Sequence, residues 1–265
     1  PGGLIARAVK MGIPVRVVLI TNGDDNIFST DLEFKKLYPN AHEFMMAGER
    51  RQLETLAALK IAGVEEKDVV FLGFPDRGIR SLYRKYMDKP YRSKGTKDIR
   101  APYPRIYEKH VLYTGRNLSR EMKEMITGFK PTIVIAPHLN DHHPDHRYSA
   151  RFIIRILNGE YVHKPDGDRP ALYTYLVHHR YFPARKGLIP DFYLLPPFHD
   201  TFNMEWFKFM LTKEEEHNKE RAIMLYKTQL PVPELGKLMK SFVRRNELFE
   251  AVDYMSPDVL DSIRK

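Results

Sequence analysis

The sequence contains 265 residues, lacks cysteine, and carries a formal net charge of +9 from 43 basic and 34 acidic side chains. This length suits one large domain or two small ones, and without cysteine a bound metal would need His, Asp or Glu ligands. We find no run of 18 apolar residues and no charged-then-apolar leader, so we expect no transmembrane helix within this sequence and a cytoplasmic location.

The first third of the chain alternates helix-like and strand-like segments. The predicted elements are, in order, the end of a helix over residues 5–10, a strand over 15–20, a helix over 49–62 and a strand over 69–72. The near-continuous apolar character of the first strand is typical of a parallel sheet with both faces covered. Acidic side chains follow each strand: Asp24 and Asp25 come after the first, and Asp76 after the second.

A basic, tyrosine-rich insertion follows over about residues 77–110. It contains eleven Lys or Arg residues against three acids, so it carries +8 of the net charge, and five tyrosines are interleaved. Its prolines argue against long regular structure. Basic and aromatic side chains together can bind phosphates and stack on bases or sugars, but such a segment is also typical of a solvated insertion.

The rest of the chain continues the alternation. The predicted elements are a helix capped by Ser119 and ending at Gly128, a strand over 132–136, a helix over 148–157, a strand over 172–177, a helix opened by the capping box Thr212–Glu215, and a last helix over 235–249. Within the capping-box helix we expect an ion pair between Glu215 and Lys219. The pattern predicts an α/β fold: a doubly wound, mostly parallel, Rossmann-like sheet with helices on both faces. Residues 1–265 are expected to form one domain, with a helical C-terminal part over about 205–250.

The hexapeptide Asp141-His142-His143-Pro144-Asp145-His146 is the strongest functional signal. It lies between a predicted strand and a predicted helix, where open α/β sheets bind ligands. Neutral imidazole and carboxylate suit zinc and related divalent metals. His143 and His146, three residues apart, can face one point and supply one or two ligands. Side chains after other predicted strands can converge on them: Asp24, Asp25, Asp76 and His178. The alternative is a polar surface loop.

Several segments, in the correct order over nearly the whole chain, resemble the LmbE-like, or PIG-L-like, family of metal-dependent N-deacetylases. They are residues 18–23, 51–59, 71–76, 130–146 and 175–178, and the helix that carries Lys219, Tyr226 and Gln229. The resemblance implies hydrolysis of an N-acetyl amide on a small amino-sugar conjugate, with metal-bound water attacking the carbonyl. It leaves open whether the conjugate is anionic and whether the protein is an oligomer.

The resemblance also assigns roles to individual residues. His146 is expected to be a ligand of zinc (Zn²⁺) or another divalent metal. The expected catalytic residues are His143, Asp145 and Asp141, where His143 polarises the carbonyl or shuttles a proton, Asp145 orients it and Asp141 shapes the loop. The expected substrate-binding residues are Arg51, Asp76 and His178.

One family motif is missing from this sequence. The family carries His-Pro-Asp-Asp-Glu, which supplies two metal ligands and a general base, at the end of its first strand and shortly before a Gly-Gly pair. Here Gly2 and Gly3 are already the second and third residues, so we expect the first strand to be absent and the chain alone to be poorly stable and to bind metal weakly. The chain is then either an N-terminally truncated piece of an active enzyme or a non-catalytic remnant. A further alternative is a module that binds anions or nucleic acid through the basic insertion, although nucleic acid is not the expected partner.

Overall fold

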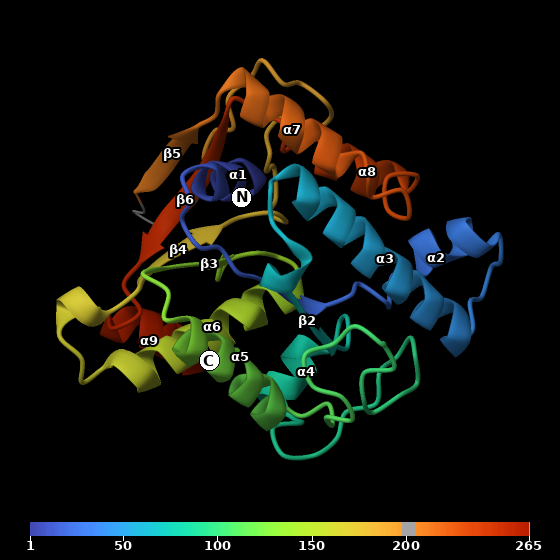
Figure 1. Ribbon diagram of the computed structural model, residues 1–265. Helices are drawn as coiled ribbons and strands as arrows, with labels where there is room; N and C mark the ends of the chain where they lie inside the picture. The colour runs from blue at the N-terminus through green and yellow to red at the C-terminus, as the bar shows by residue number, and fades with distance from the viewer. Residues whose placement is uncertain (198–204, 265) are drawn as a thin grey trace.

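Helices and strands alternate along the computed structural model, which describes residues 1–197 and 205–264 (Figure 1). The elements are α1 (Gly2–Lys10), β1 (Val17–Thr21), α2 (Ile27–Phe34), α3 (Ala41–Ile61), η1 (Glu66–Asp68), β2 (Val69–Phe74), α4 (Ile79–Arg84), α5 (Gly115–Phe129), β3 (Ile133–Pro137), α6 (Pro144–Tyr161), η2 (Asp166–Asp168), β4 (Ala171–Tyr175), β5 (Trp206–Met210), α7 (Lys213–Ile223), α8 (Pro233–Lys240), β6 (Asn246–Val252) and α9 (Pro257–Arg264). None of the helices within the described ranges is both long and apolar enough to cross a membrane.

The strands form two sheets. β1 and β2 pair in parallel, and the second sheet has the order β3-β4-β6-β5. Within it β3 and β4 are parallel, whereas β6 runs antiparallel to both of its neighbours. The α/β prediction is confirmed, but the sheet is not wholly parallel. Among the described residues, β1 and β3 each pair with a strand on one side only.

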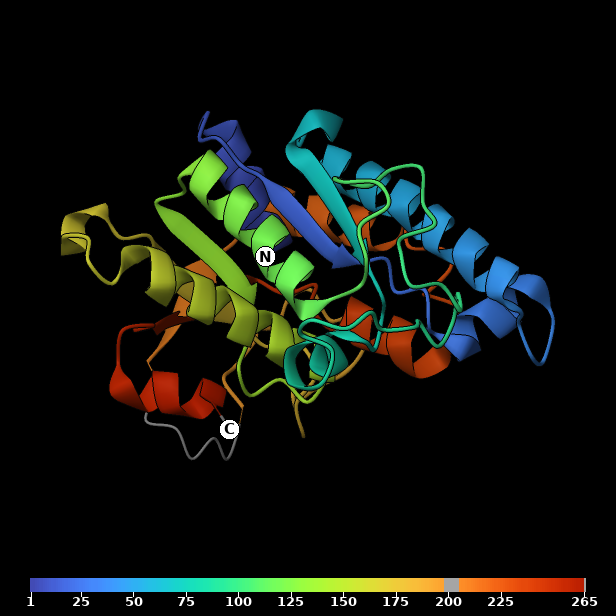
Figure 2. The same cartoon turned by 90° about the horizontal axis from the view of Figure 1, so that it is seen from below.

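One apolar core spans both sheets. Helices α5 and α6 contribute its centre, with Leu118, Met122, Phe152 and Ile154 all buried, and side chains of β1, β2 and β3 pack against them. Figure 2 shows α5 lying across the region between β1 and β3. The two sheets are therefore held together by helix packing rather than by hydrogen bonds between β1 and β3.

Local capping explains where two predicted helices begin. Helix α3 starts at residue 41 because Asn40 and Glu43 form a capping box, eight residues before the expected start. Helix α5 is capped by Thr114, whose side chain accepts a hydrogen bond from the Asn117 amide, so the prediction of Ser119 as the cap is wrong. The short helix α2 was not predicted from the sequence.

The C-terminal part differs most from expectation. The capping box of Thr212 and Glu215 is present at the start of α7. However, Glu215 pairs with Arg7 of α1 and Lys219 pairs with Glu247 of β6, so the predicted Glu215–Lys219 pair is wrong. The predicted last helix ends at Lys240, and β6 follows, buried between β4 and β5. Residues 205–250 therefore contain two strands besides their helices.

Candidate active site

The candidate site lies beyond the ends of two parallel strand pairs, β1 with β2 and β3 with β4. Asp24 and Asp25 follow β1, Asp76 follows β2, the hexapeptide 141–146 follows β3, and His178 follows β4. Pro144 is at the start of α6, where its fixed φ suits the first helical turn and its missing N–H is not needed. The strand ends therefore place the predicted residues at one edge of the fold.

Three imidazoles cluster at this edge. The ring centroid of His143 lies 4.9 Å from that of His146 and 5.3 Å from that of His178, and His146 and His178 are 5.2 Å apart. His179, the next residue along the chain, instead lies against His142, with ring centroids 4.7 Å apart. Of these two neighbouring histidines, only His178 therefore packs within the cluster of His143 and His146.

Asp141 contacts the residues of this cluster and holds them in position. It is fully buried, and its carboxylate contacts Nδ1 of His146 at 3.1 Å and accepts the backbone N–H groups of His143 at 2.8 Å and of Val177 and His178 at 3.0 Å. Burial opposes ionisation, but the hydrogen bonds from His146 and the backbone prevail and lower the pKa of Asp141 to about 2. The ionised carboxylate directs the Nδ1 proton of His146 and leaves Nε2 as the available ring nitrogen.

The other two histidines are held in their neutral form. Burial, followed by the charge of nearby His146, lowers the pKa of His178 to about 4, and burial also lowers the pKa of His143. Nδ1 of His143 is buried without a hydrogen-bond partner among the described residues. Neutral imidazoles retain a lone pair, so both rings can accept a proton or bind a cation.

Asp76, His143 and Asp145 form a group whose ligand atoms lie within 4.8 Å of one another. Asp145 accepts backbone N–H groups from Arg77 and Ile79. Burial and the neighbouring charge of Asp76 raise the pKa of Asp145 to about 8, because two adjacent buried carboxylates resist joint ionisation. A shared proton or a divalent cation relieves that repulsion, and two oxygens with one imidazole are a donor set that fits zinc, manganese or iron.

The carboxylates after β1 and β2 are interlocked. The Asp76 amide donates to Asp24 at 3.1 Å, and the Asp25 amide donates to Asp76 at 3.1 Å. Burial and then Asp76 raise the pKa of Asp24 to about 7. The Tyr103 hydroxyl, which comes from the basic insertion, donates to Asp24. Sequence reasoning missed Tyr103, because nothing in a proline-rich loop distinguishes this tyrosine from its four neighbours.

Arg51 reaches the same acids from α3. Its side chain is buried, donates to the Ser29 hydroxyl and is attracted by Asp76 and Asp24, although burial lowers its pKa. Gly23 has a φ of +68°, and a Cβ there would lie 2.6 Å from Nη1 of Arg51. The glycine therefore makes room for the guanidinium. Arg51 balances buried negative charge at this position.

All seven predicted site residues thus lie in one network. Its two halves are the histidines on Asp141 and the acids around Asp76, and they meet at His143. The metal-competent group contains His143 and not the predicted ligand His146, so the metal role of His146 stays a prediction. Sequence reasoning also missed the buried pair of His138 and Glu250 beyond the end of β3.

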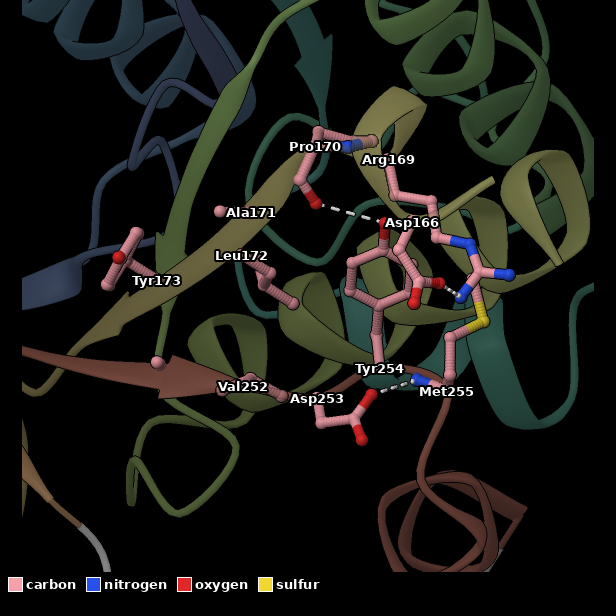
Figure 3. A pocket seen from close by; sticks show the side chains of 11 residues that line it. Asp166, Arg169, Pro170, Ala171, Leu172, Tyr173, Val252, Asp253, Tyr254 and Met255 are labelled. Carbon is pink, nitrogen blue, oxygen red and sulfur yellow. Dashed lines mark hydrogen bonds and ion pairs between the residues drawn. The ribbon is translucent and has the colours of Figure 1, made fainter. Parts of the chain in front are cut away.

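A separate pocket lies at the other end of β4 (Figure 3). It has a volume of about 340 Å³ and is bordered by Arg169, Asp166 and Tyr254. Arg169 is paired with Asp166 at 2.7 Å, and the Tyr254 hydroxyl donates to the Pro170 carbonyl at 3.0 Å. These polar groups are therefore occupied with one another, and the residues that line the pocket include no histidine.

The fold and these strand-end residues define an α/β protein with a cluster of side chains that can hold a divalent metal. The chain belongs to the PIG-L family, described as GlcNAc-PI de-N-acetylase, because the family model matches residues 1–157, more than half of the sequence. No curated relative matches the chain.

Solved structures share the fold. The zinc-inhibited form of teicoplanin deacetylase Orf2 matches with a TM-score of 0.58 and 15% identity, over 95% of this chain and 93% of that one. N,N′-diacetylchitobiose deacetylase from Pyrococcus horikoshii matches with a TM-score of 0.51 and 17% identity, over 96% of this chain and 78% of that one. The hydratase GalB from Pseudomonas putida matches with a TM-score of 0.50 and 13% identity, over 94% of this chain and 88% of that one. These identities show the fold alone, and the hydratase shows that the fold also carries other chemistry.

Proposed function

We propose that this protein is a zinc-dependent hydrolase that removes the N-acetyl group from a small amino-sugar conjugate. The observation that carries the proposal is the buried Asp141, which orients His146 beside two neutral histidines in a chain of the PIG-L family. The neighbouring deacetylases whose names mention teicoplanin and diacetylchitobiose support a sugar-like substrate.

The site residues can take different roles in the hydrolysis of the amide. Nε2 of His146 would hold the metal, and Asp76 and Asp145, which with His143 form the metal-competent group, offer the nearby carboxylates. When bound, the metal supplies a Lewis acid and a water of lowered pKa. His143, kept neutral by burial, can donate a hydrogen bond to the amide carbonyl or pass a proton to the departing amine. Asp145 is fixed by two backbone amides and can orient His143, while we expect His178 and Arg51 to contact the substrate.

We further propose that a strand between β1 and β3 completes the site. Both strands have an unpaired edge among the described residues, and all five residues of β1 are only half-buried. A parallel strand inside an α/β sheet is normally covered on both faces. The family resemblance implies that this strand carries His-Pro-Asp-Asp-Glu, and hence the general base and further ligands that residues 1–265 do not contain.

The proposal is tested by acetate release. A chain in which the native upstream residues precede Pro1 is incubated with zinc and N-acetylated amino sugars, and His146→Ala is compared with His142→Ala. His142 is exposed and belongs to the same hexapeptide, so its loss should leave the rate within about twofold. His146→Ala should lower the rate by about 10³-fold or more at every salt concentration. Equal rates in the two variants would contradict the proposed metal role.

A further inference from the structure

Two helices beside the candidate site each carry arginines at a spacing of four residues. On α6, which begins within the hexapeptide, Arg147, Arg151 and Arg155 are spaced four residues apart and share one face. On α4, Arg80 and Arg84 have the same spacing. The two helices pack against each other, as Figure 2 shows. We call these five residues the arginine cluster.

The arginine cluster has no counter-charge in the described part of the chain. None of its five guanidinium groups forms an ion pair with a carboxylate there, whereas Arg116 and Arg120 on neighbouring α5 both do. Nε and Nη1 of Arg151 are buried and have no hydrogen-bond partner among those residues. Burial lowers the pKa of Arg151, and the charges of Arg84 and Arg147 lower it further. Like charges at this spacing destabilise a helix, so an external anion would relieve a cost that the fold otherwise carries.

Tyr148 holds two of the arginines in place. Nε of Arg84 donates to its hydroxyl at 3.0 Å, and the guanidinium carbon of Arg151 lies 4.8 Å from the ring centroid. Tyr83 packs edge-on against Tyr148 and is itself anchored by a hydrogen bond of 2.8 Å to the Ile263 carbonyl of α9. Two guanidinium groups held by one tyrosine, one at its hydroxyl and one at its ring, lose little freedom when an anion binds to them.

We infer that the arginine cluster is a binding site for a phosphate-class anion. The planar fork of arginine matches phosphate oxygens in a bidentate manner, and the free donors of Arg151 are of that kind. The site starts at the candidate active site, because Arg147 follows His146 directly and its Nε donates to the Asp141 carbonyl at 3.1 Å. The phosphate is carried either by the substrate itself, a source that rests on the proposed function, or by lipid headgroups.

The basic insertion gains a definite role from this assignment. Its first eight residues, 77–84, include α4 and with it Arg80 and Arg84, while most of its other cations lie in the loop beyond. The anion site therefore combines one short helix of the insertion with α6. The cations of the loop provide a matched control, because Lys89 and Lys109 are exposed and belong to the same charged segment.

The test measures binding of inorganic phosphate to the full chain by calorimetry, without metal and without substrate. Arg84→Gln/Arg151→Gln is compared with Lys89→Gln/Lys109→Gln, which removes the same charge. We expect about a tenfold loss of affinity in the arginine variant and less than a twofold change in the lysine variant. Equal losses in the two variants, or no phosphate binding by the unaltered chain, would overturn the inference. Because the experiment measures phosphate binding, its result does not depend on whether the protein is a deacetylase.

A second variant and a second probe complete the test. If Arg84→Gln/Arg151→Gln fails to fold, the exposed single change Arg155→Gln decides, and an unchanged phosphate affinity there would overturn the inference. Sedimentation with phosphatidylcholine vesicles, with and without phosphatidylinositol, separates the sources. Arginine-dependent binding to phosphatidylinositol vesicles supports a lipid source, whereas phosphate binding without vesicle binding supports a phosphorylated soluble substrate.

Discussion

At the scale of single residues, burial decides which side chains the candidate site can use. Asp141 and Asp145 are both buried carboxyls in the same loop, yet their pKa values move in opposite directions. Asp141 receives hydrogen bonds from His146 and three backbone amides, whereas Asp145 faces the carboxylate of Asp76. Environment rather than residue type therefore assigns their roles.

Asp141 should stabilise the fold in a pH-dependent manner. Its pKa of about 2 lies below the unfolded value of 3.8, so its contribution is present above that value and is lost as the pH falls through the folded pKa. The difference between the folded and unfolded pKa values corresponds to about 2 kcal/mol of the free energy of unfolding. Denaturant unfolding at pH 6 and pH 2 should show this loss in the unaltered chain but not in Asp141→Asn, and an equal loss in both would contradict the assignment.

Glu121 should act in the opposite direction. Both carboxylate oxygens of this α5 residue are buried without a hydrogen-bond partner in the described ranges, and burial raises its pKa to about 8. Because the folded pKa lies above the unfolded one, the carboxylate destabilises the protein increasingly as the pH rises from about 4.5 to about 8. Glu121→Gln should therefore melt at a higher temperature than the unaltered chain at pH 9 and at the same temperature at pH 4. Glu124→Gln, on the same helix, is the control and should show no such pH-dependent gain.

At the scale of elements, the sequence revealed local signals but not distant partners. The capping box of Thr212 and Glu215 could be predicted because both residues lie within one helical turn. The Glu215 carboxylate, however, pairs with Arg7, more than 200 residues away, and Lys219 pairs with Glu247. Likewise the short, buried strand β6 could not be distinguished from a helix, because its apolar run is too brief to show a period.

The Arg7–Glu215 pair joins α1 to α7, and its strength can be measured. Its Nε–Oε1 distance is 2.7 Å, and both side chains are mostly shielded from solvent. A double-mutant cycle with Arg7→Gln and Glu215→Gln should give a coupling energy of about 1 kcal/mol in thermal or denaturant unfolding. The corresponding cycle for Glu215 and Lys219 should give a coupling energy near zero. A larger coupling energy for Glu215 and Lys219 than for Arg7 and Glu215 would show that the pairing inferred from the sequence is the real one.

At the scale of the whole molecule, the alternation of helices and strands predicted the class of fold and a mostly parallel sheet, whereas the antiparallel pairing of β6 came only from the structure. The sequence identified the site residues after β1, β2, β3 and β4 because parallel strands end at one edge. It could not predict that β6 runs antiparallel between β4 and β5, or that the basic insertion contributes Tyr103 to the acids. Both depend on chain segments that meet only after folding.

The division into two sheets leads to a prediction for residues 1–265 alone. Strands β1 and β3 each have an unpaired edge within the described ranges, and Ile133 at the start of β3 is 55% exposed. Unpaired backbone groups at two strand edges, and an exposed apolar side chain at one of them, lower stability and favour association. Residues 1–265 alone should therefore melt broadly at low temperature in calorimetry and bind zinc weakly. Adding the native upstream residues should raise the melting temperature and tighten zinc binding together, because one strand would close both edges and supply the further ligands. A sharp, high-temperature transition of residues 1–265 with tight stoichiometric zinc would show that the two sheets need no strand between them.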